Sequence, residues 1–379
     1  MDMAKPKIRF KGYTDDWEQR KLGEIAIEIL AGGDIDKEKV VDDGTYPIYA
    51  NALTNDGIVG YYNDYYRVKA PAVTVTGRGE VGHAQARMTD FTPVVRLLAI
   101  RSNHDCYFLE NAINNQNVVV ESTGVPQLTV PQLSSYDICF PKDIREEEKI
   151  GAYYKKLDNL ITLHQRKCEE TKKLKKYMLQ KMFPQNGQTV PEIRFAGFTD
   201  AWEQRKLGDI CSRVQGNDGR MELPTLTISA GNGWMNQEDR FSGNIAGKEQ
   251  KNYTLLKRGE LSYNHGNSKL AKYGTVFSLQ TYEEALVPRV YHSFKVEKGN
   301  ANFVEYYFAT KLPDRELGKL ISSGARMDGL LNIGYDDFMG ISLLLPKTQE
   351  QDCIAGYFRK IDMFITLHHR KYIYILKSP

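Results

Sequence analysis

Two stretches of the chain place apolar side chains at alternating steps of four and three residues. The two stripes are Ile150, Tyr154, Leu157, Ile161, His164 and Cys168, and Ile354, Phe358, Ile361, Ile365, His368, Tyr372 and Ile375. This spacing puts the side chains on one face of an α-helix and is typical of helices that pack on another helix. It predicts a long helix over about 142–182 and a second helix from 346 onward.

The repetition of the stripe indicates what each helix contacts. Two equivalent helices can bury equivalent faces against each other, and we expect this arrangement. The alternative is packing against the core of the helix's own domain. His164 and His368 occupy the same step of the two stripes, and we interpret them as polar residues that fix the register of the helix pair. A metal site is the less favoured interpretation, because no Cys, Asp or Glu at ligand spacing accompanies either histidine.

Before each helix, short apolar runs alternate with glycine, proline and asparagine. Examples are AVTVT at 72–76, VVRLLAI at 94–100 and ISLLL at 341–345. Runs of this length with such boundaries predict short β-strands. The segments 26–140 and 211–345 are therefore interpreted as mixed α/β or α+β inserts.

A repeated block precedes each insert. Residues 6–25 and 191–210 share fifteen of twenty positions, and both contain WEQRKLG, at 17–23 and 202–208. The helices repeat as well, with LITLHQRK at 160–167 and FITLHHRK at 364–371. The inserts align weakly, with 76–79 opposite 263–266. They are therefore expected to be diverged copies of one fold that carry different recognition surfaces.

Composition narrows the class of protein. The chain has 379 residues, enough for two domains, and a formal net charge of +3, which allows a local basic groove without indicating a strongly basic nucleic-acid binder. Its five cysteines include no CxxC pair, so neither a zinc site nor a redox pair is predicted. The N-terminus lacks an apolar signal region and no apolar run is long enough to cross a bilayer. We expect a cytoplasmic protein with no membrane contact.

Two motifs resemble nucleotide-binding sites, but the residues around them do not fit such a site. GRGEVG at 77–82 follows a predicted strand, but HAQARMTDFTP comes next and has no helical face to meet a pyrophosphate. Its glycines are better interpreted as a strand-to-strand loop that approaches another backbone closely. SGNIAGKEQ at 242–250 has Glu249 where a P-loop needs Ser or Thr.

Recognition chemistry remains. Arg78 lies between two glycines and could bind guanine O6 and N7, or a phosphate. At the matched place in the second insert, asparagine could read adenine and lysine could bind phosphate or guanine. A solvated loop side chain is the alternative for each of them. The candidate DNA contacts are Gly77, Arg78, Gly79, His83, Gln127, Asn264, His265, Asn267, Lys269, Lys272 and Arg326.

With these features the chain resembles the specificity subunits of type I restriction–modification systems. The resemblance covers nearly the whole length and depends on the two WEQRKLG blocks, on the Pro-Lys pairs at 141–142 and 346–347, and on the repeated helices. It implies an α+β fold with two target recognition domains, joined by two long antiparallel helices in a coiled coil with a pseudo-twofold internal repeat. The expected boundaries are 1–140, 141–184, 185–345 and 346–379.

The resemblance also implies function. The family is non-catalytic, each insert reads one half of a bipartite DNA target, and the helices act as a spacer. Two adenine-methylating modification subunits dock on the frame regions, and restriction subunits join them. S-adenosylmethionine, ATP and Mg²⁺ are expected in those partners and no cofactor in this chain. The second helix is shorter than the first by one to two turns, which is a departure from the repeat. The alternative function is a coiled-coil adaptor that binds proteins without reading bases.

Overall fold

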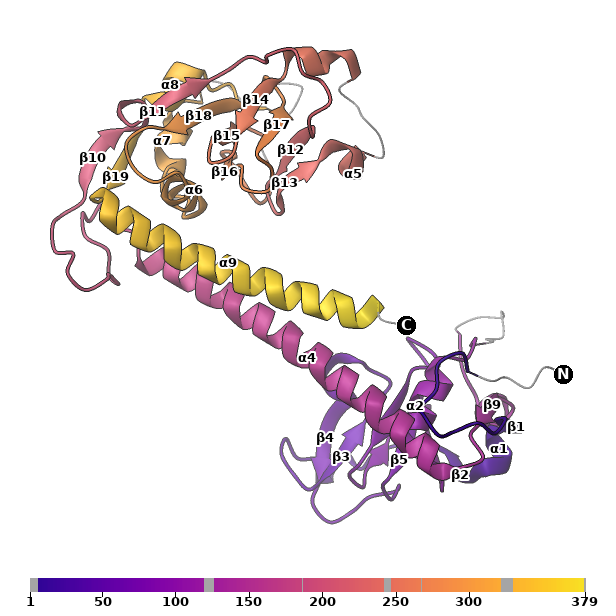
Figure 1. Ribbon diagram of the computed structural model, residues 1–379. Coiled ribbons are helices and arrows are strands. Elements are labelled where there is room, and N and C mark those ends of the chain that lie inside the picture. The colour runs from indigo at the N-terminus through magenta and orange to yellow at the C-terminus, as the bar shows by residue number, and fades with distance from the viewer. Residues whose placement is uncertain are drawn as a thin grey trace. The chain divides into compact units, whose positions relative to one another are not determined.

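A computed structural model describes residues 6–118, 126–185, 187–241, 247–266, 268–321 and 330–377 of the chain (Figure 1). The chain divides into two compact units, Met1–Leu163 and His164–Pro379. Both contain helices and short strands, so the fold is mixed α/β, as the sequence predicted.

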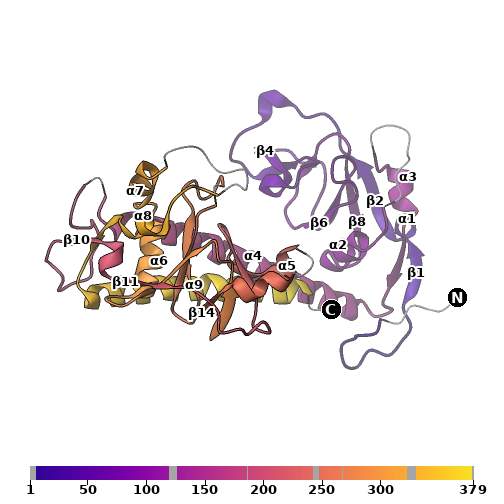
Figure 2. The same cartoon turned by 90° about the horizontal axis from the view of Figure 1, so that it is seen from above.

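The first unit contains a four-stranded antiparallel sheet in the order β2-β8-β5-β6. Its strands are β2 (Ala26–Ala31), β8 (Leu97–Ser102), β5 (Ala72–Thr76) and β6 (Ala84–Arg87). A second sheet has the order β4-β3-β7, with β4 (Ile58–Tyr62), β3 (Tyr46–Tyr49) and β7 (Thr92–Pro93). The helix α2 (Cys106–Asn114) packs on β6 and β5 (Figure 2). The unit also contains the short helices α1 (Leu22–Ile25) and α3 (Val130–Ser134).

Alternating side chains of the four-stranded sheet supply two cores. Val73 and Val75 pack with Phe108 of α2, whereas Ala72 packs with Tyr49 and other residues of a separate cluster. Successive side chains of a strand point to opposite faces, so β5 is buried on both sides, and all five of its residues are buried. The run 72–76 is thus confirmed as a strand. The run 94–100 is partly wrong as a strand, because β8 begins at Leu97, directly after Arg96 with a φ of +71°.

The second unit contains a four-stranded sheet in the order β11-β18-β15-β16. Its strands are β11 (Cys211–Val214), β18 (His292–Val296), β15 (Leu261–Asn264) and β16 (Thr275–Ser278). The helix α6 (Ala301–Ala309) packs on β16, as α2 packs on β6. Two antiparallel strand pairs accompany this sheet, β12 (Leu226–Ser229) with β13 (Gly233–Asn236) and β14 (Thr254–Lys257) with β17 (Glu284–Val287). Short helices are α5 (Gln237–Phe241), α7 (Asp314–Lys319) and α8 (Tyr335–Met339).

The helices α2 and α6 begin with the same kind of cap. The side chain of Asp105 accepts a hydrogen bond from the Phe108 N–H at 2.8 Å, and Asn300 accepts one from the Phe303 N–H at 3.1 Å. Such N-caps stabilise a helix start by satisfying one of its unpaired amides. Each cap therefore places a phenylalanine of the first turn in the core of its unit.

The repeated blocks make repeated contacts. In the first unit, β1 (Glu18–Lys21) pairs with β9 (Asp137–Phe140) from Glu18 opposite Phe140. In the second, β10 (Glu203–Lys206) pairs with β19 (Ser342–Leu345) in the same register. The EQRK tetrapeptide thus serves the same purpose twice, since it joins each frame block to the strand that precedes the long helix.

The long helices are α4 (Ile144–Lys181) and α9 (Thr348–Lys377), close to the predicted ranges. Within the second unit, the last half of α4 lies beside α9 and runs antiparallel to it (Figure 1). His164 meets His368, Cys168 Sγ lies 3.9 Å from the Ile365 carbonyl oxygen, and Lys175 pairs with Asp362. No helix in the described part of the chain is both long and apolar enough to cross a membrane.

Part of the predicted stripe packs differently from the expectation. Ile150 packs against the core of the first unit, and Ile354, Phe358 and Ile361 lie in the core of the second. Tyr154 is 42% exposed, while Leu157 and Ile161 are half-buried. Four-and-three spacing buries one helix face whatever covers it, so the start of each helix uses its stripe to attach to its own unit.

The His164–His368 contact predicts a pH effect on the second unit. The two Nδ1 atoms lie 3.0 Å apart, so one ring must donate and the other accept. Burial, and then the nearby His368, Lys371 and Lys167, hold the pKa of His164 below its ordinary value. Because the pKa of His164 is lowered in the folded state, the unfolded chain binds more protons than the folded chain as the pH falls below about 6.5. Acidification therefore lowers the free energy of unfolding.

We therefore expect the midpoint temperature of unfolding to be lower at pH 5 than at pH 7. The decrease should be larger in the unchanged chain than in His164→Leu, which cannot take up this proton. Thermal unfolding followed by circular dichroism at both pH values measures the difference. Equal losses in the two proteins would contradict a role for the histidine pair.

Candidate nucleic-acid interface

The candidate Gly77, Arg78 and Gly79 lie in the loop between β5 and β6. These strands pair antiparallel, with Val75 opposite Ala84, so the GRGEVG segment joins two strands of a hairpin. The interpretation as a strand-to-strand loop is confirmed. A dinucleotide site would need a helix to begin here, and this segment leads into β6.

The side chain of Asn51 fixes the start of this loop. Its Oδ1 accepts hydrogen bonds from the N–H groups of Gly77 and Arg78 at 2.8 and 3.3 Å. Its Nδ2 donates to the Val95 carbonyl oxygen at 3.1 Å. Asn51 is 26 residues away in the sequence and was not predicted; asparagine is common in loops, so the sequence gives no signal for this role.

The far side of the loop is also held. Thr76 N–H donates to the His83 carbonyl at 2.9 Å, and His83 N–H donates to Thr76 Oγ1 at 3.0 Å. Gly79 has a φ of +75°, a conformation that glycine adopts without strain. The side chain of His83 is exposed. The loop therefore presents Arg78 and His83 from a fixed backbone.

Arg78 and Arg87 show two different uses of arginine in this hairpin. Arg87 is 5% exposed, stacks 3.7 Å from the centroid of the Tyr49 ring and binds Asp56 at 2.9 Å. Arg78 is half-buried, its Nε has no hydrogen-bond partner, and it forms no ion pair with any residue that the structure describes. Arg87 is thus part of the domain's own packing, whereas the guanidinium of Arg78 makes no hydrogen bond or ion pair with a described residue.

Gly77 allows the loop to approach a neighbouring backbone. A Cβ at this position would lie 2.2 Å from the carbonyl oxygen of Arg96 and 3.1 Å from that of Leu128. We expect Gly77→Ala to lower the free energy of unfolding by about 1–3 kcal/mol, because overpacking forces the backbone to shift. Glu80→Ala, at an exposed position of the same loop, should change it by less than about 0.5 kcal/mol. Urea unfolding measures both, and equal effects would contradict the close approach.

The matched hairpin of the second unit joins β15 to β16, with Asn264 opposite Thr275. The structure gives two of the predicted DNA contacts a place within the domain. Asn264 donates from Nδ2 to the Ile228 carbonyl at 3.2 Å and accepts at Oδ1 from the Gly266 N–H at 3.0 Å. His265 is 6% exposed and lies between Tyr263 and His292.

His292 belongs to the same buried group. Its Nε2 lies 2.9 Å from the Ile333 carbonyl oxygen, and burial lowers its pKa from the ordinary value. A histidine that is hard to protonate suits a packed interior. The rings of Tyr263 and Phe338 stack beside it at 4.3 Å. This cluster supports the base of the hairpin.

The lysines of the second hairpin remain accessible. Lys269 and Lys272 are exposed, and Lys272 Nζ lies 5.3 Å from the centroid of the Tyr273 ring. Asn267 and Arg326 lie outside the described residues, as do residues 242–246 of the P-loop-like segment. Two cations thus extend from this loop toward solvent.

In each unit, a later segment of the chain donates a backbone hydrogen bond to the residue that follows the first strand of the hairpin. In the first unit, Leu128 N–H donates to the Gly77 carbonyl at 3.0 Å; in the second, Leu331 N–H donates to the His265 carbonyl at 2.9 Å. Gln127 is half-buried. It lies near the Gly-Arg-Gly turn, because the next residue, Leu128, is bonded to Gly77. The hairpin loop and the returning segment therefore form one surface in each unit.

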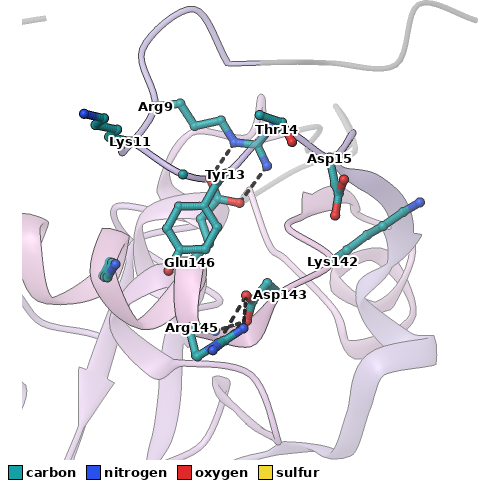
Figure 3. Close-up of a pocket in the computed structure, with 11 residues that line it drawn as sticks. Arg9, Lys11, Tyr13, Thr14, Asp15, Lys142, Asp143, Arg145 and Glu146 are labelled. Carbon is teal, nitrogen blue, oxygen red and sulfur yellow. Dashed lines mark hydrogen bonds and ion pairs between the residues drawn. The ribbon is translucent and has the colours of Figure 1, made fainter.

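A second candidate feature is a hollow of about 320 Å³ between the first frame block and the start of α4 (Figure 3). Arg9 donates from Nε and Nη2 to the two oxygens of Glu146 at 2.6 and 2.8 Å. The Arg145 guanidinium beside Asp143 holds the pKa of that carboxyl below its ordinary value. Arg194 binds Glu350 in the same two-pronged way, at 2.7 and 2.7 Å. These pairs attach each frame block to its helix.

No group of three or more His, Cys, Asp and Glu side chains that could hold a metal ion occurs within the described ranges. What the geometry provides is a pair of topologically matched hairpin loops with different side chains. One carries an arginine between glycines and the other carries lysines. Such loops on a rigid sheet suit the reading of a polyanion rather than covalent chemistry.

Comparison with known proteins agrees with this assignment. The family model for the type I restriction modification DNA specificity domain matches residues 14–173. Two Mycoplasma pneumoniae (strain ATCC 29342 / M129) proteins named as type I specificity subunits are 29% and 28% identical over 161 and 144 residues. These matches cover 41% and 36% of this chain but 47% and 39% of the relatives, so the chain spans less than half the length of the curated relatives it matches.

The crystal structure of an S subunit of a type I restriction–modification system from M. genitalium has a similar fold. The TM-score is 0.65 at 12% identity, over 98% of this chain and 96% of that one. Residues 14–173 therefore form a DNA specificity domain. Most of this family match lies in the first unit, which ends at Leu163.

Proposed function

We propose that the chain is the non-catalytic DNA-reading subunit of a type I restriction–modification complex. The observation that carries the proposal is the Gly-Arg-Gly hairpin loop, in which Asn51 fixes the backbone and the guanidinium of Arg78 has no internal partner among the described residues. This loop lies in the part of the chain that matches a DNA specificity domain. An arginine held in this way suits a guanine edge in the major groove.

Each unit reads one half of a two-part target. The sheets have the same strand order, and the returning segments bond to the same place in both hairpins, which supports duplication of one fold. The loops differ, with Arg78 in one and Lys269 and Lys272 in the other. Two unlike readers on one duplex require an asymmetric target.

The pairing of α4 with α9 acts as a coiled-coil spacer. Contacts at three successive levels of the second unit support antiparallel packing: His164 with His368, Cys168 with Ile365, and Lys175 with Asp362. A stiff spacer gives the unread gap one length. If both readers face one side of B-DNA, the half-site centres lie about 10 bp apart.

The frame blocks dock two modification subunits, which methylate adenine, and restriction subunits join this assembly. The repeated contacts of the two blocks, Arg9 with Glu146 and Arg194 with Glu350, support two equivalent docking places. The chain's net charge of +3 fits a subunit that shares phosphate contacts with partners. Those partners supply S-adenosylmethionine, ATP and Mg²⁺.

The test is to co-express the chain with its modification subunits in a host that lacks other adenine methylation and to map methylated adenines across the genome. The expected result is one asymmetric two-part motif with a constant gap. An uninterrupted motif, or a gap of variable length, would contradict the two-reader arrangement. A host that expresses only the modification subunits is the control.

A further inference from the structure

Each unit has a tight turn at the start of a strand that pairs with its candidate hairpin. In the first unit the Leu97 N–H donates to the Val94 carbonyl at 3.0 Å, and β8 begins at Leu97. In the second unit the Tyr291 N–H donates to the Pro288 carbonyl at 3.0 Å, and β18 begins at the next residue. Both are four-residue turns closed by the same kind of hydrogen bond. We call them the β8 turn, from Val94 to Leu97, and the β18 turn, from Pro288 to Tyr291.

Strand pairing places each turn at the loop end of its hairpin. β5 pairs with β8 so that Thr76, the last residue of β5, lies opposite Leu97. β15 pairs with β18 so that Tyr263 lies opposite His292, the first residue of β18. The β8 turn therefore adjoins the Gly-Arg-Gly loop, and the β18 turn adjoins the loop of the second hairpin.

Hydrogen bonds fix each turn to its hairpin. Asn51, which holds the backbone of the Gly-Arg-Gly loop, also donates to the Val95 carbonyl of the β8 turn at 3.1 Å. In the second unit the Ile228 N–H donates to the Tyr291 hydroxyl of the β18 turn at 3.2 Å, and the Ile228 carbonyl accepts from Asn264 of the hairpin at 3.2 Å. One bridging residue thus joins turn and hairpin in each unit.

The two central residues of each turn are one arginine and one valine. Arg96 follows Val95 in the β8 turn, and Arg289 precedes Val290 in the β18 turn. Val95 is 42% exposed and Val290 52%; Arg289 is exposed and Arg96 half-buried. Neither guanidinium makes a hydrogen bond or ion pair with a residue that the structure describes. The two turns therefore present the same pair of side chains in opposite order.

The backbone of Arg96 is held in an unfavourable conformation. Its φ is +71°, in the left-handed region that residues other than glycine adopt only at a cost. A turn with a positive φ at its third residue usually carries glycine or asparagine there. Strain of this kind is typical of residues that contact a ligand, which indicates that the guanidinium of Arg96 has a use at this place.

We propose that the β8 turn and the β18 turn form a second DNA-reading element in each unit, with Arg96 and Arg289 bound to guanine edges in the major groove. An arginine alone would suit a phosphate as well as guanine. The exposed valine beside each arginine favours the bases, because the major groove offers the methyl group of thymine as an apolar contact and a phosphate offers none. This inference rests on the proposed DNA-reading function.

The test maps methylated adenines for the unchanged chain, for Arg96→Gly and for Arg289→Ala, each co-expressed with the modification subunits. Arg96→Gly should reduce the discrimination between bases at one position of the first half-site by about five- to 150-fold and leave the second half unchanged. Arg289→Ala should do the same in the second half-site only. Both positions should be ones at which the unchanged chain requires a G·C pair.

Two controls separate DNA reading from folding. Glycine adopts a positive φ without strain, so Arg96→Gly should melt at or above the temperature of the unchanged chain when followed by circular dichroism. Lys311→Gly is the matched control, because Lys311 is an exposed cation with a φ of +67° that lies outside both turns. It should leave the methylated motif unchanged.

A motif that stays the same in either variant would overturn the inference for that turn and leave the proposed function intact. An even loss of methylation at all sequences would overturn it as well, since that result indicates phosphate contacts. If the unchanged chain itself gives no two-part motif, the proposed function is overturned and this inference with it.

Discussion

Replacing Phe183 with alanine is expected to lower the free energy of unfolding of the second unit by about 3–5 kcal/mol. The side chain is fully buried, and its ring contacts those of Trp202, Phe303, Tyr307 and Phe358 at centroid distances of 5.5 to 6.0 Å. Removal of the ring leaves a cavity that these aromatic neighbours cannot close without moving. The loss is a large part of the stability of an ordinary domain.

The measurement is urea unfolding followed by tryptophan fluorescence, in which Trp202 and Trp234 report on the second unit and Trp17 reports on the first. Tyr154→Ala is the matched control, because Tyr154 stands where the second unit has Phe358 but is 42% exposed. It should change the free energy of unfolding by less than about 1 kcal/mol. A similar loss in both variants would mean that Tyr154 is covered in solution.

The repeated features were the most predictable from the sequence. Identical EQRK tetrapeptides form strands in identical register, and the arginine that follows the proline of each frame block binds a buried glutamate of the next helix. Repetition helps because the same local sequence, followed by the same partner sequence, has the same lowest-energy contacts. The strand at 72–76 and both long helices were also predictable, since their periodicity is strong.

The spacing of the apolar stripe did not predict which part of the molecule the stripe would pack against. Ile354 and Phe358 pack in their own unit's core, although the same four-and-three pattern would suit a partner helix equally well. An apolar helix face indicates that the face is buried, but it does not indicate which surface covers it. The His164–His368 contact was predictable because a repeated polar residue in an apolar stripe needs a polar partner.

The candidate interface was predictable only in outline. The position of the loops followed from strand boundaries, but the use of Asn264 and His265 within the domain depends on contacts with Ile228 and His292, which are distant in the sequence. The reverse holds for Asn51, whose amide shapes the Arg78 loop from 26 residues away. Short polar side chains at strand ends form hydrogen bonds with nearby backbone groups. Their presence in a loop therefore does not show whether they contact DNA or stabilise the loop.

Arg78→Ala is expected to have the largest effect on function. If the guanidinium binds a base edge, its loss weakens binding to the first half-site by about 1–3 kcal/mol, or roughly five- to 150-fold. Methylation mapped across a genome should then show a relaxed base at one position of the first half and an unchanged second half. The fold should be retained, because within the described residues Arg78 forms no side-chain hydrogen bond or ion pair.

Two further substitutions separate base reading from simple charge. Arg78→Lys keeps the charge and loses the two-pronged donor geometry, so it should resemble Arg78→Ala in specificity while it retains more affinity. Lys269→Ala in the second hairpin, if that lysine binds phosphate, should weaken binding evenly across sequences and reduce the slope of log K against log salt by about 1. Loss of methylation at both halves alike in Arg78→Ala would reject the assignment, because a reader confined to one unit cannot relax both.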